Sequence, residues 1–227
     1  MIRFLSAAII LSAVISSFAF AQDSTPKVQV FGGYSLVHVT SGGLNGFAID
    51  EDLHQFPNTF GVATNFQGWN AEGQYNATKW IGIAIDAGER SGTPITAHGA
   101  AGLPTFHAYS LMVGPVLSYR AMKKLTPFAH ALAGWDRASL NATNITGLLS
   151  PISTRASNYT DFAVALGGGV DYNLSHHVSL RLAQLDWFHT SINQSKLYSG
   201  AFGPGEFEGL STRQVNLRFS AGIVVRF

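Results

Sequence analysis

The sequence predicts an all-β fold, a closed antiparallel up-and-down transmembrane β-barrel of about eight strands, and three observations lead to this prediction. Apolar residues recur at every second position through much of the chain, which is the period of a strand with two different faces. The connections between these segments are alternately short and long, as in barrels that cross a bilayer. Charged residues make up 12% of the chain, whereas an ordinary soluble domain carries about 25%.

The N-terminus has the three parts of a secretory signal peptide. Arg3 precedes an apolar stretch, and Ala19-Phe20-Ala21 forms an A-x-A cleavage pattern. We therefore expect residues 1–21 to be removed, leaving one barrel domain of residues 22–227. Loss of Arg3 leaves 13 Lys+Arg (14 minus 1) against 13 Asp+Glu. A neutral chain without a basic patch argues against a nucleic-acid partner, and the absence of cysteine excludes disulfides and thiolate metal sites.

Seven segments alternate clearly between apolar and small or polar residues. In chain order they are residues 27–38, 68–75, 80–88, 108–120, 161–172, 178–183 and 215–227. In 108–120, for example, Tyr109, Leu111 and Val113 share one face, and Ser110 and Ser118 share the other. Each segment approaches the roughly 9–11 residues that a tilted strand needs to cross a bilayer.

Two regions are less regular. Residues 127–135 could present either face to the apolar side. After residue 183 the alternation breaks, because Gln184 and Asp186 fall on the apolar parity while Leu185 and Trp187 do not. A bulge near Ala183 would restore the register; alternatively the strand leaves the apolar layer there. Both alternatives remain open at this point.

The connections predict the orientation of the barrel. Residues 76–79, 121–126 and 173–177 are short connections, whereas 40–63, 89–107, 136–160 and 190–211 are long. This pattern predicts long extracellular loops, short periplasmic turns and both termini on the periplasmic side. Ten strands also remain open, since 40–63 could contain a hairpin.

The apolar face is expected to contact lipid, because the opposite face is too poorly charged for a soluble exterior. Gly, Ala, Ser and isolated charges fit a narrow barrel interior instead. Aromatic residues near strand ends are typical of interfacial girdles; they are Trp69, Tyr75, Trp80, Tyr109, Tyr119 and Tyr172. If the faces were inverted, the chain would be a soluble lipocalin-like carrier with Leu111, Val113 and Phe219 lining its cavity.

Alternation directs a set of charged residues to the interior. They are Glu72, Asp86, Arg120, Asp161, Asp171, Arg181, Arg218 and Arg226. Asp171 and Arg181 flank the short turn 173–177 and are predicted to pair. Buried charges must be paired or hydrated, so these residues form either a structural network that plugs the lumen or an ion path gated by the pairs. The narrow interior favours the plug.

The last strand resembles the C-terminal assembly signal of bacterial outer-membrane proteins, with Phe227 last and Phe219, Ile223 and Val225 alternating before it. VQVFGGYS at 28–35 and DFAVALGGGVDY at 161–172 are similar to segments of opacity-type and OmpA-type small barrels. The resemblance implies a Gram-negative outer-membrane location, a lipid environment, and recognition of the last strand by the barrel-assembly machinery. The ligand of the loops and the oligomeric state stay undetermined.

No catalytic motif is present, and no catalytic, cofactor-binding or metal-binding residue is predicted. His38, His107 and His189 lie near the predicted extracellular ends of strands. His107 with Ser110 is the nearest approach to a lipid-modifying pair, but Ser110 falls on the opposite face from Tyr109. We therefore expect a non-enzymatic structural or surface-interaction role. The alternatives are a narrow porin-like channel and, with less support, a lipid-acting enzyme.

Overall fold

The computed structural model describes residues 26–41, 60–62, 65–93, 95–97, 105–141, 156–191, 193, 196–197 and 214–227. The predicted signal peptide and most of the four long connections lie outside these residues.

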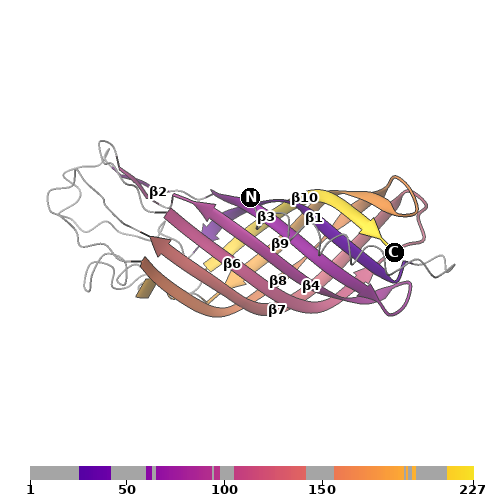
Figure 1. Cartoon of the computed structure of the whole chain (residues 1–227), viewed down its shortest axis with the longest axis horizontal. Coiled ribbons are helices and arrows are strands. Elements are labelled where there is room, and N and C mark those ends of the chain that lie inside the picture. Colours follow the sequence, from indigo (N-terminus) through magenta and orange to yellow (C-terminus); the bar gives the residue numbers. More distant parts are fainter. Residues whose placement is uncertain are drawn as a thin grey trace, which may run out of the picture.

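Eight strands close into one antiparallel barrel in the order β1-β10-β9-β8-β7-β6-β4-β3 (Figure 1). Their bounds are β1 Val28–Ser41, β3 Asn65–Asn76, β4 Ile81–Gly92, β6 Thr105–Ser118, β7 Leu125–Asn141, β8 Ala156–Asn173, β9 Val178–Thr190 and β10 Gln214–Arg226. The up-and-down barrel and its strand count are therefore confirmed. Strands β7 and β8 are longer than expected, because their pairing continues to Asn141 and Ala156.

The sequence leaves open a hairpin within residues 40–63, and the structure describes one short strand, β2 (Phe60–Val62), at the end of this interval. β2 pairs with β5 (Ile95–Ala97), which follows β4, in a separate two-stranded sheet. Both segments lie in long connections at the end of the barrel opposite the C-terminus (Figure 1). Neither strand enters the barrel wall, so the alternative of a ten-stranded barrel is wrong.

The strands are tilted against the barrel axis (Figure 1). The pairing register gives the size of this tilt. A row of directly paired residues runs once around the wall through Ile81, Leu117, Ala129, Gly168, Leu185, Phe219, Leu36, Gln67 and Ser91. It returns to β4 ten residues further along (91 minus 81). For eight strands this stagger corresponds to a tilt of about 40°. The interior of such a barrel has room for side chains and little else.

The two irregular strands now have defined faces. In β7, His130 and Leu132 point inward, while Trp135 is 63% exposed on the outside. In β9 there is a bulge: Val170 pairs with Ala183 and Asp171 pairs with Arg181, which leaves Leu182 extra. The bulge alternative is therefore correct, and Gln184 and Asp186 point into the lumen.

The apolar residues of the alternating segments face outward. Leu111, Val113 and Phe219 are 51%, 46% and 41% exposed, so they do not line a cavity, and the alternative of inverted faces with a lipocalin-like cavity is wrong. Inward positions hold polar, charged and small residues with a few large apolar ones such as Phe31 and Phe188. Among the described residues, no helix has the length and hydropathy of a membrane span.

Local hydrogen bonds shape the short-turn end. The Thr78 hydroxyl accepts hydrogen bonds from the backbone N–H groups of Trp80 (3.2 Å) and Ile81 (3.0 Å), a side-chain substitute for backbone turn bonds. The C-terminus lies at this end (Figure 1). There the Phe227 backbone N–H donates to the Val28 carbonyl at 2.9 Å, and the Lys27 N–H donates to the Phe227 carbonyl at 2.8 Å. Backbone hydrogen bonds between the first and last strands thus continue to the ends of both strands at this end of the barrel.

Candidate functional site

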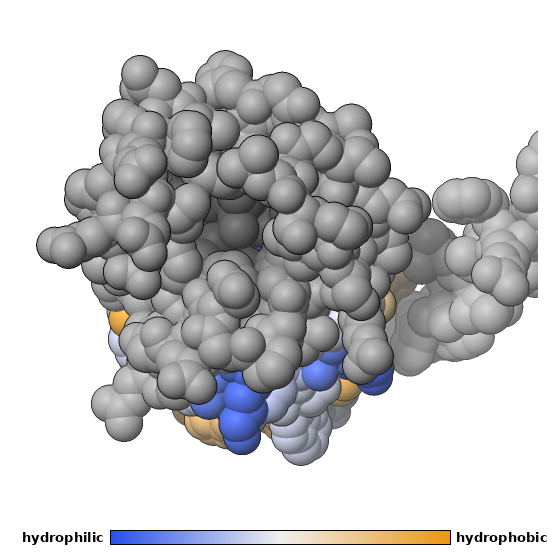
Figure 2. Space-filling model, turned by 90° about the vertical axis from the view of Figure 1, so that its left-hand side faces the viewer, coloured by the Kyte–Doolittle hydropathy of each residue, from blue (hydrophilic) through white to orange (hydrophobic). Residues whose placement is uncertain are grey.

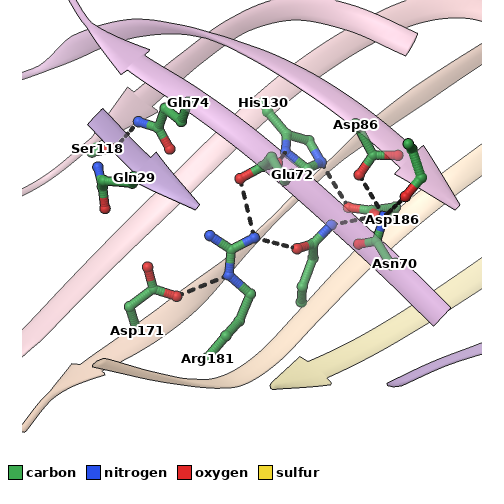
Figure 3. A network of polar contacts seen from close by, with 12 residues as sticks. Gln29, Asn70, Glu72, Gln74, Asp86, Ser118, His130, Asp171, Arg181 and Asp186 are labelled. Atoms are coloured by element: carbon green, nitrogen blue, oxygen red, sulfur yellow. Dashed lines mark hydrogen bonds and ion pairs between the residues drawn. The ribbon is translucent and has the colours of Figure 1, made fainter. Parts of the chain in front are cut away.

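Six of the residues expected inside the barrel are buried in its lumen, each at most 6% exposed: Glu72, Asp86, Asp171, Arg181, Arg218 and Arg226. Strands β3, β4, β8, β9 and β10 supply them. Because inward side chains from opposite walls meet across a narrow barrel, these charges form contacts between residues far apart in the sequence (Figure 3).

Arg181 is the centre of one part of this network, the part nearer the short turns, which we call the lower part. Its Nε donates to Asp171 Oδ1 at 2.9 Å, which is the predicted pair. Its Nη1 donates to Glu72 Oε1 at 3.2 Å and to Gln184 Oε1 at 2.7 Å. The guanidinium also lies 4.3 Å and 4.1 Å from the ring centroids of Phe31 and Phe128, close enough for cation–π attraction to both. Figure 3 shows Arg181 reaching toward Asp171 on one side and Glu72 on the other.

Asp186 and Arg218 form the centre of the other part of the network, nearer the long connections, which we call the upper part. Arg218 Nε donates to Asp186 Oδ2 at 2.8 Å, and Nη1 donates to Asp86 Oδ1 at 2.8 Å. Asn70 Nδ2 donates to Asp86 Oδ2 at 2.7 Å, and Gln184 Nε2 donates to Asp186 Oδ2 at 2.8 Å. Gln184 contacts both Arg181 and Asp186, so it connects the two parts.

His130 lies between two carboxylates, one from each part of the network (Figure 3). Its Nε2 is 2.8 Å from Asp186 Oδ1, and its Nδ1 is 3.4 Å from Glu72 Oε2. The imidazole side chain is fully buried. It is therefore a second connection across the lumen, from β7 to β3 and β9.

A separate ion pair lies nearer the long-loop end. Arg90 Nη1 donates to Asp136 Oδ1 at 2.9 Å, and Nη2 bonds the other carboxylate oxygen. The Arg90 guanidinium is 5.1 Å from the Phe188 ring centroid, and that of Arg218 is 5.8 Å away. A bidentate pair thus joins β4 to β7 across the lumen, between the central network and the long-loop end.

The remaining two predicted residues lie near the ends of the barrel. Half-buried Arg120 donates to the Lys79 carbonyl at 2.8 Å and to Asn76 Oδ1 at 3.0 Å. Burial, with the nearby Arg226 guanidinium, lowers the pKa of Arg120 to about 10, so it is charged at neutral pH. Half-exposed Asp161 accepts a hydrogen bond from the Phe162 backbone N–H at 2.7 Å. Both residues are peripheral to the central network.

Arg226 extends the network to the short-turn end. Its Nε donates to Gln29 Oε1 at 3.1 Å, and its Nη2 lies 3.7 Å from Asp171 Oδ2. Charged and polar contacts therefore run from this end of the lumen to the Arg90–Asp136 pair.

Sequence patterns missed several members of the network. Arg90 and Asp136 lie in intervals assigned to loops, although the alternation of β4 and β7 continues through them. His130 belongs to the strand whose direction was open. Gln184 and Asp186 lie beyond the bulge. Extending the parity of β4 by two residues would have found Arg90 from the sequence.

The outer surface carries aromatic residues near both ends. Tyr75, Trp80 and Tyr119 are exposed near the short turns, where half-buried Tyr172 also lies, and the rings of Trp80 and Tyr119 are 5.2 Å apart. Trp69 and Tyr109 are exposed toward the other end. Four exposed aromatic residues of the described strands were not selected beforehand, and they also face outward: Tyr34, Trp135, Phe162 and Trp187. In Figure 2, hydrophilic surface on the visible part of the wall adjoins hydrophobic surface.

His107 and Ser110 do not share a site. His107 faces outward, where Glu89 Oε1 lies 3.3 Å from its Nδ1 and Trp69 Nε1 donates to Glu89 Oε2 at 2.8 Å. Ser110 is buried at 8% exposure on the inner face. A nucleophile–base pair needs direct contact, so this pair cannot act together.

The C-terminal strand has the alternation expected for it. Phe219 and Ile223 are exposed on the outer face, and Val225 and Phe227 are half-buried. Arg218, Val224 and Arg226 point inward between them.

The lumen holds a salt-bridge network that joins several strands. Beside it, a cavity of about 10 Å³ is lined by Ser35, Ser110, Phe188 and Arg218 among others, which is room for about one water molecule. Within the described segments, no group of three His, Asp or Glu residues is arranged to hold a metal ion. The arrangement suits mechanical cross-bracing of the wall.

Comparisons with known proteins agree with this architecture. A family model described as "Outer membrane protein beta-barrel domain" matches residues 6–222. Among solved structures, the chain is similar to Ail, the attachment invasion locus protein of Yersinia pestis, with 13% identity, 89% of this chain and 99% of that chain covered, and a TM-score of 0.51. It is also similar to Neisserial surface protein A (NspA), with 15% identity, coverage of 88% and 97%, and a TM-score of 0.52. At these identities the likeness is one of fold. No match was found among curated proteins.

Proposed function

The chain belongs to the outer membrane protein β-barrel domain family, and from this premise we propose that it is a closed, non-enzymatic barrel that serves as a structural and surface-interaction scaffold. In this role the barrel anchors the chain in the outer membrane and presents the long connections at one end to the surroundings.

The observation that carries the proposal is the salt-bridge network that crosses the lumen. Arg181, Arg218 and their carboxylate partners link β3, β4, β8, β9 and β10 across the interior, and the Arg90–Asp136 pair joins β4 to β7 above them. Their bonds lie across the path that a solute would follow. A stable plug of this kind supports a scaffold better than a transport role.

The runner-up is a narrow ion channel, and the polar lining itself favours it. Polar and charged residues occupy the lumen from Arg226 to Arg90, so rupture of a few pairs would leave a hydrophilic path. A scaffold and a gated channel differ in whether the pairs break under ordinary conditions.

Single-channel recording in planar bilayers separates the two roles. We expect the purified wild-type protein to insert without discrete conductance steps. As a positive control, the double variant Arg181→Ala with Glu72→Ala removes two large side chains from the lumen, and we expect it to conduct. Regular, reproducible steps from the wild-type protein would overturn the closed scaffold in favour of the channel.

A further inference from the structure

We infer that His130 is a doubly protonated imidazolium at neutral pH and that its positive charge completes the plug in the lumen. The inference rests on the proposed closed lumen and adds to it a residue whose protonation state holds the lumen closed.

The first support is the position of the two ring nitrogens. Nε2 is 2.8 Å from Asp186 Oδ1 and Nδ1 is 3.4 Å from Glu72 Oε2. A neutral imidazole has one N–H and one lone pair, so it would direct a lone pair at one carboxylate. Only the imidazolium removes this lone pair and attracts both carboxylates, through a hydrogen bond from Nε2 to Asp186 and an ion-pair contact of Nδ1 with Glu72.

The second support is the charge balance of the lumen. The buried charged side chains of the described chain comprise five carboxylates, namely Glu72, Asp86, Asp136, Asp171 and Asp186, and four guanidiniums, namely Arg90, Arg181, Arg218 and Arg226. Within this fully buried set, four positive charges face five negative charges. Half-buried Arg120 lies at the short-turn end, where it bonds the Lys79 carbonyl and Asn76. A second proton on His130 brings the sum to zero, and an uncompensated buried charge is strongly unfavourable.

The groups around His130 leave no other cation for this role. The charged residues of the surrounding network are Glu72 on β3, Asp86 on β4, Asp171 on β8, Arg181 and Asp186 on β9, and Arg218 and Arg226 on β10. Arg181 and Arg218 each pair with two carboxylates, and Arg226 pairs with Asp171. Neighbouring β6 contributes apolar Met112 and Val116, and Phe128 lies beside the imidazole with its ring centroid 5.9 Å away.

The inference has a pH dependence with a defined sign. Loss of the second proton at alkaline pH removes the attraction to one carboxylate and restores the charge imbalance. The stabilisation is therefore present at neutral pH and is lost as the pH rises. We expect the longer contact, between Nδ1 and Glu72, to break first, which would free one side of the plug.

Histidine NMR tests the protonation state directly. The protein would be labelled with ¹⁵N-histidine and measured in micelles at pH 8, where a histidine with an ordinary pKa of about 6.5 is mostly neutral. We expect one residue of the eight histidines to retain two protonated ring nitrogens, and its signal to disappear in His130→Gln. If every histidine shows a neutral tautomer, the inference is wrong. This readout is independent of conductance, so a conducting wild-type protein would overturn the closed scaffold without deciding the charge of His130.

A charge-rescue pair tests whether the charge matters. His130→Gln should lower the midpoint temperature of gel-monitored unfolding by roughly 10 °C, as expected for a broken buried pair. Adding Glu72→Gln removes the surplus negative charge and should recover part of the loss. His176→Gln, in an exposed turn, is the matched control and should have no effect. A double variant no more stable than His130→Gln, or a His130→Gln variant as stable as the wild type, would contradict the inference.

Discussion

Arg181 shows how much one buried side chain can organise in a narrow lumen. It bonds Asp171, Glu72 and Gln184 and is enclosed by the rings of Phe31 and Phe128. Its partners come from strands that are distant in the sequence, since Glu72 and Arg181 are 109 residues apart. Removing such a cation leaves Glu72 and Asp171 buried with only their longer contacts to His130 and Arg226, and breaking a buried pair in this way is strongly destabilising.

Arg181→Ala should therefore destabilise the barrel strongly. We expect the free energy of unfolding to fall by about 3–5 kcal/mol, measured by denaturant titration of the protein refolded into lipid vesicles. Arg137→Ala is the control, because Arg137 is exposed on the outer face of β7, and its loss should change stability by less than about 1 kcal/mol. Equal effects of the two substitutions would show that the network adds little.

At the scale of the strand, the bulge in β9 decides which residues reach the lumen. Below it, Ser179 and Arg181 point inward, and above it Gln184 and Asp186 do. Without the extra residue, one half of β9 would present its polar side chains to lipid and its leucines to the lumen, because a shift of one residue exchanges the two faces. The bulge is thus the reason that Asp186 meets Arg218.

Deletion of Leu182 tests this role. We expect the deletion variant not to form the compact, SDS-resistant species that a folded barrel gives on an unheated gel. Leu182→Ala keeps the bulge and changes only a lipid-facing side chain that is 52% exposed, so it should fold. A deletion variant with a normal gel shift would mean that β9 can shift its register without loss.

At the scale of the whole molecule, the barrel is closed by its first and last strands. Lys27, Val28 and Phe227 exchange backbone hydrogen bonds at the short-turn end. These bonds are made by the backbone of Phe227, so they do not depend on which side chain the residue carries. The resemblance of the last strand to an assembly signal indicates that the phenylalanine side chain itself acts in biogenesis.

Phe227→Ala should accordingly separate assembly from stability. In cells, we expect less heat-modifiable barrel in the outer-membrane fraction than for the wild type. In vitro, refolding of the purified variant into detergent should proceed normally, since the backbone bonds remain. Phe162→Ala, an exposed aromatic on β8, is the matched control. Normal outer-membrane levels of the Phe227 variant would argue against the signal.

The sequence by itself determined the fold class and the outer face of most strands, and it predicted about eight strands with ten left open. These properties follow from local information, because alternation with a period of two assigns a side to each residue without reference to any other strand. That is why Leu111 and Phe219 were expected outside and Glu72 and Arg218 inside.

Apart from the Asp171–Arg181 pair, which the sequence predicts across a short turn, only the tertiary structure decided which inward residues meet, which way β7 faces, and where β2 and β5 pair. These depend on the stagger of the strands, the bulge at Leu182 and the contacts across the lumen, and each joins residues remote in sequence. Asp86 and Arg218 are 132 residues apart, so no local pattern relates them. They meet because closure of eight tilted strands around a narrow interior brings opposite walls within reach of one side chain.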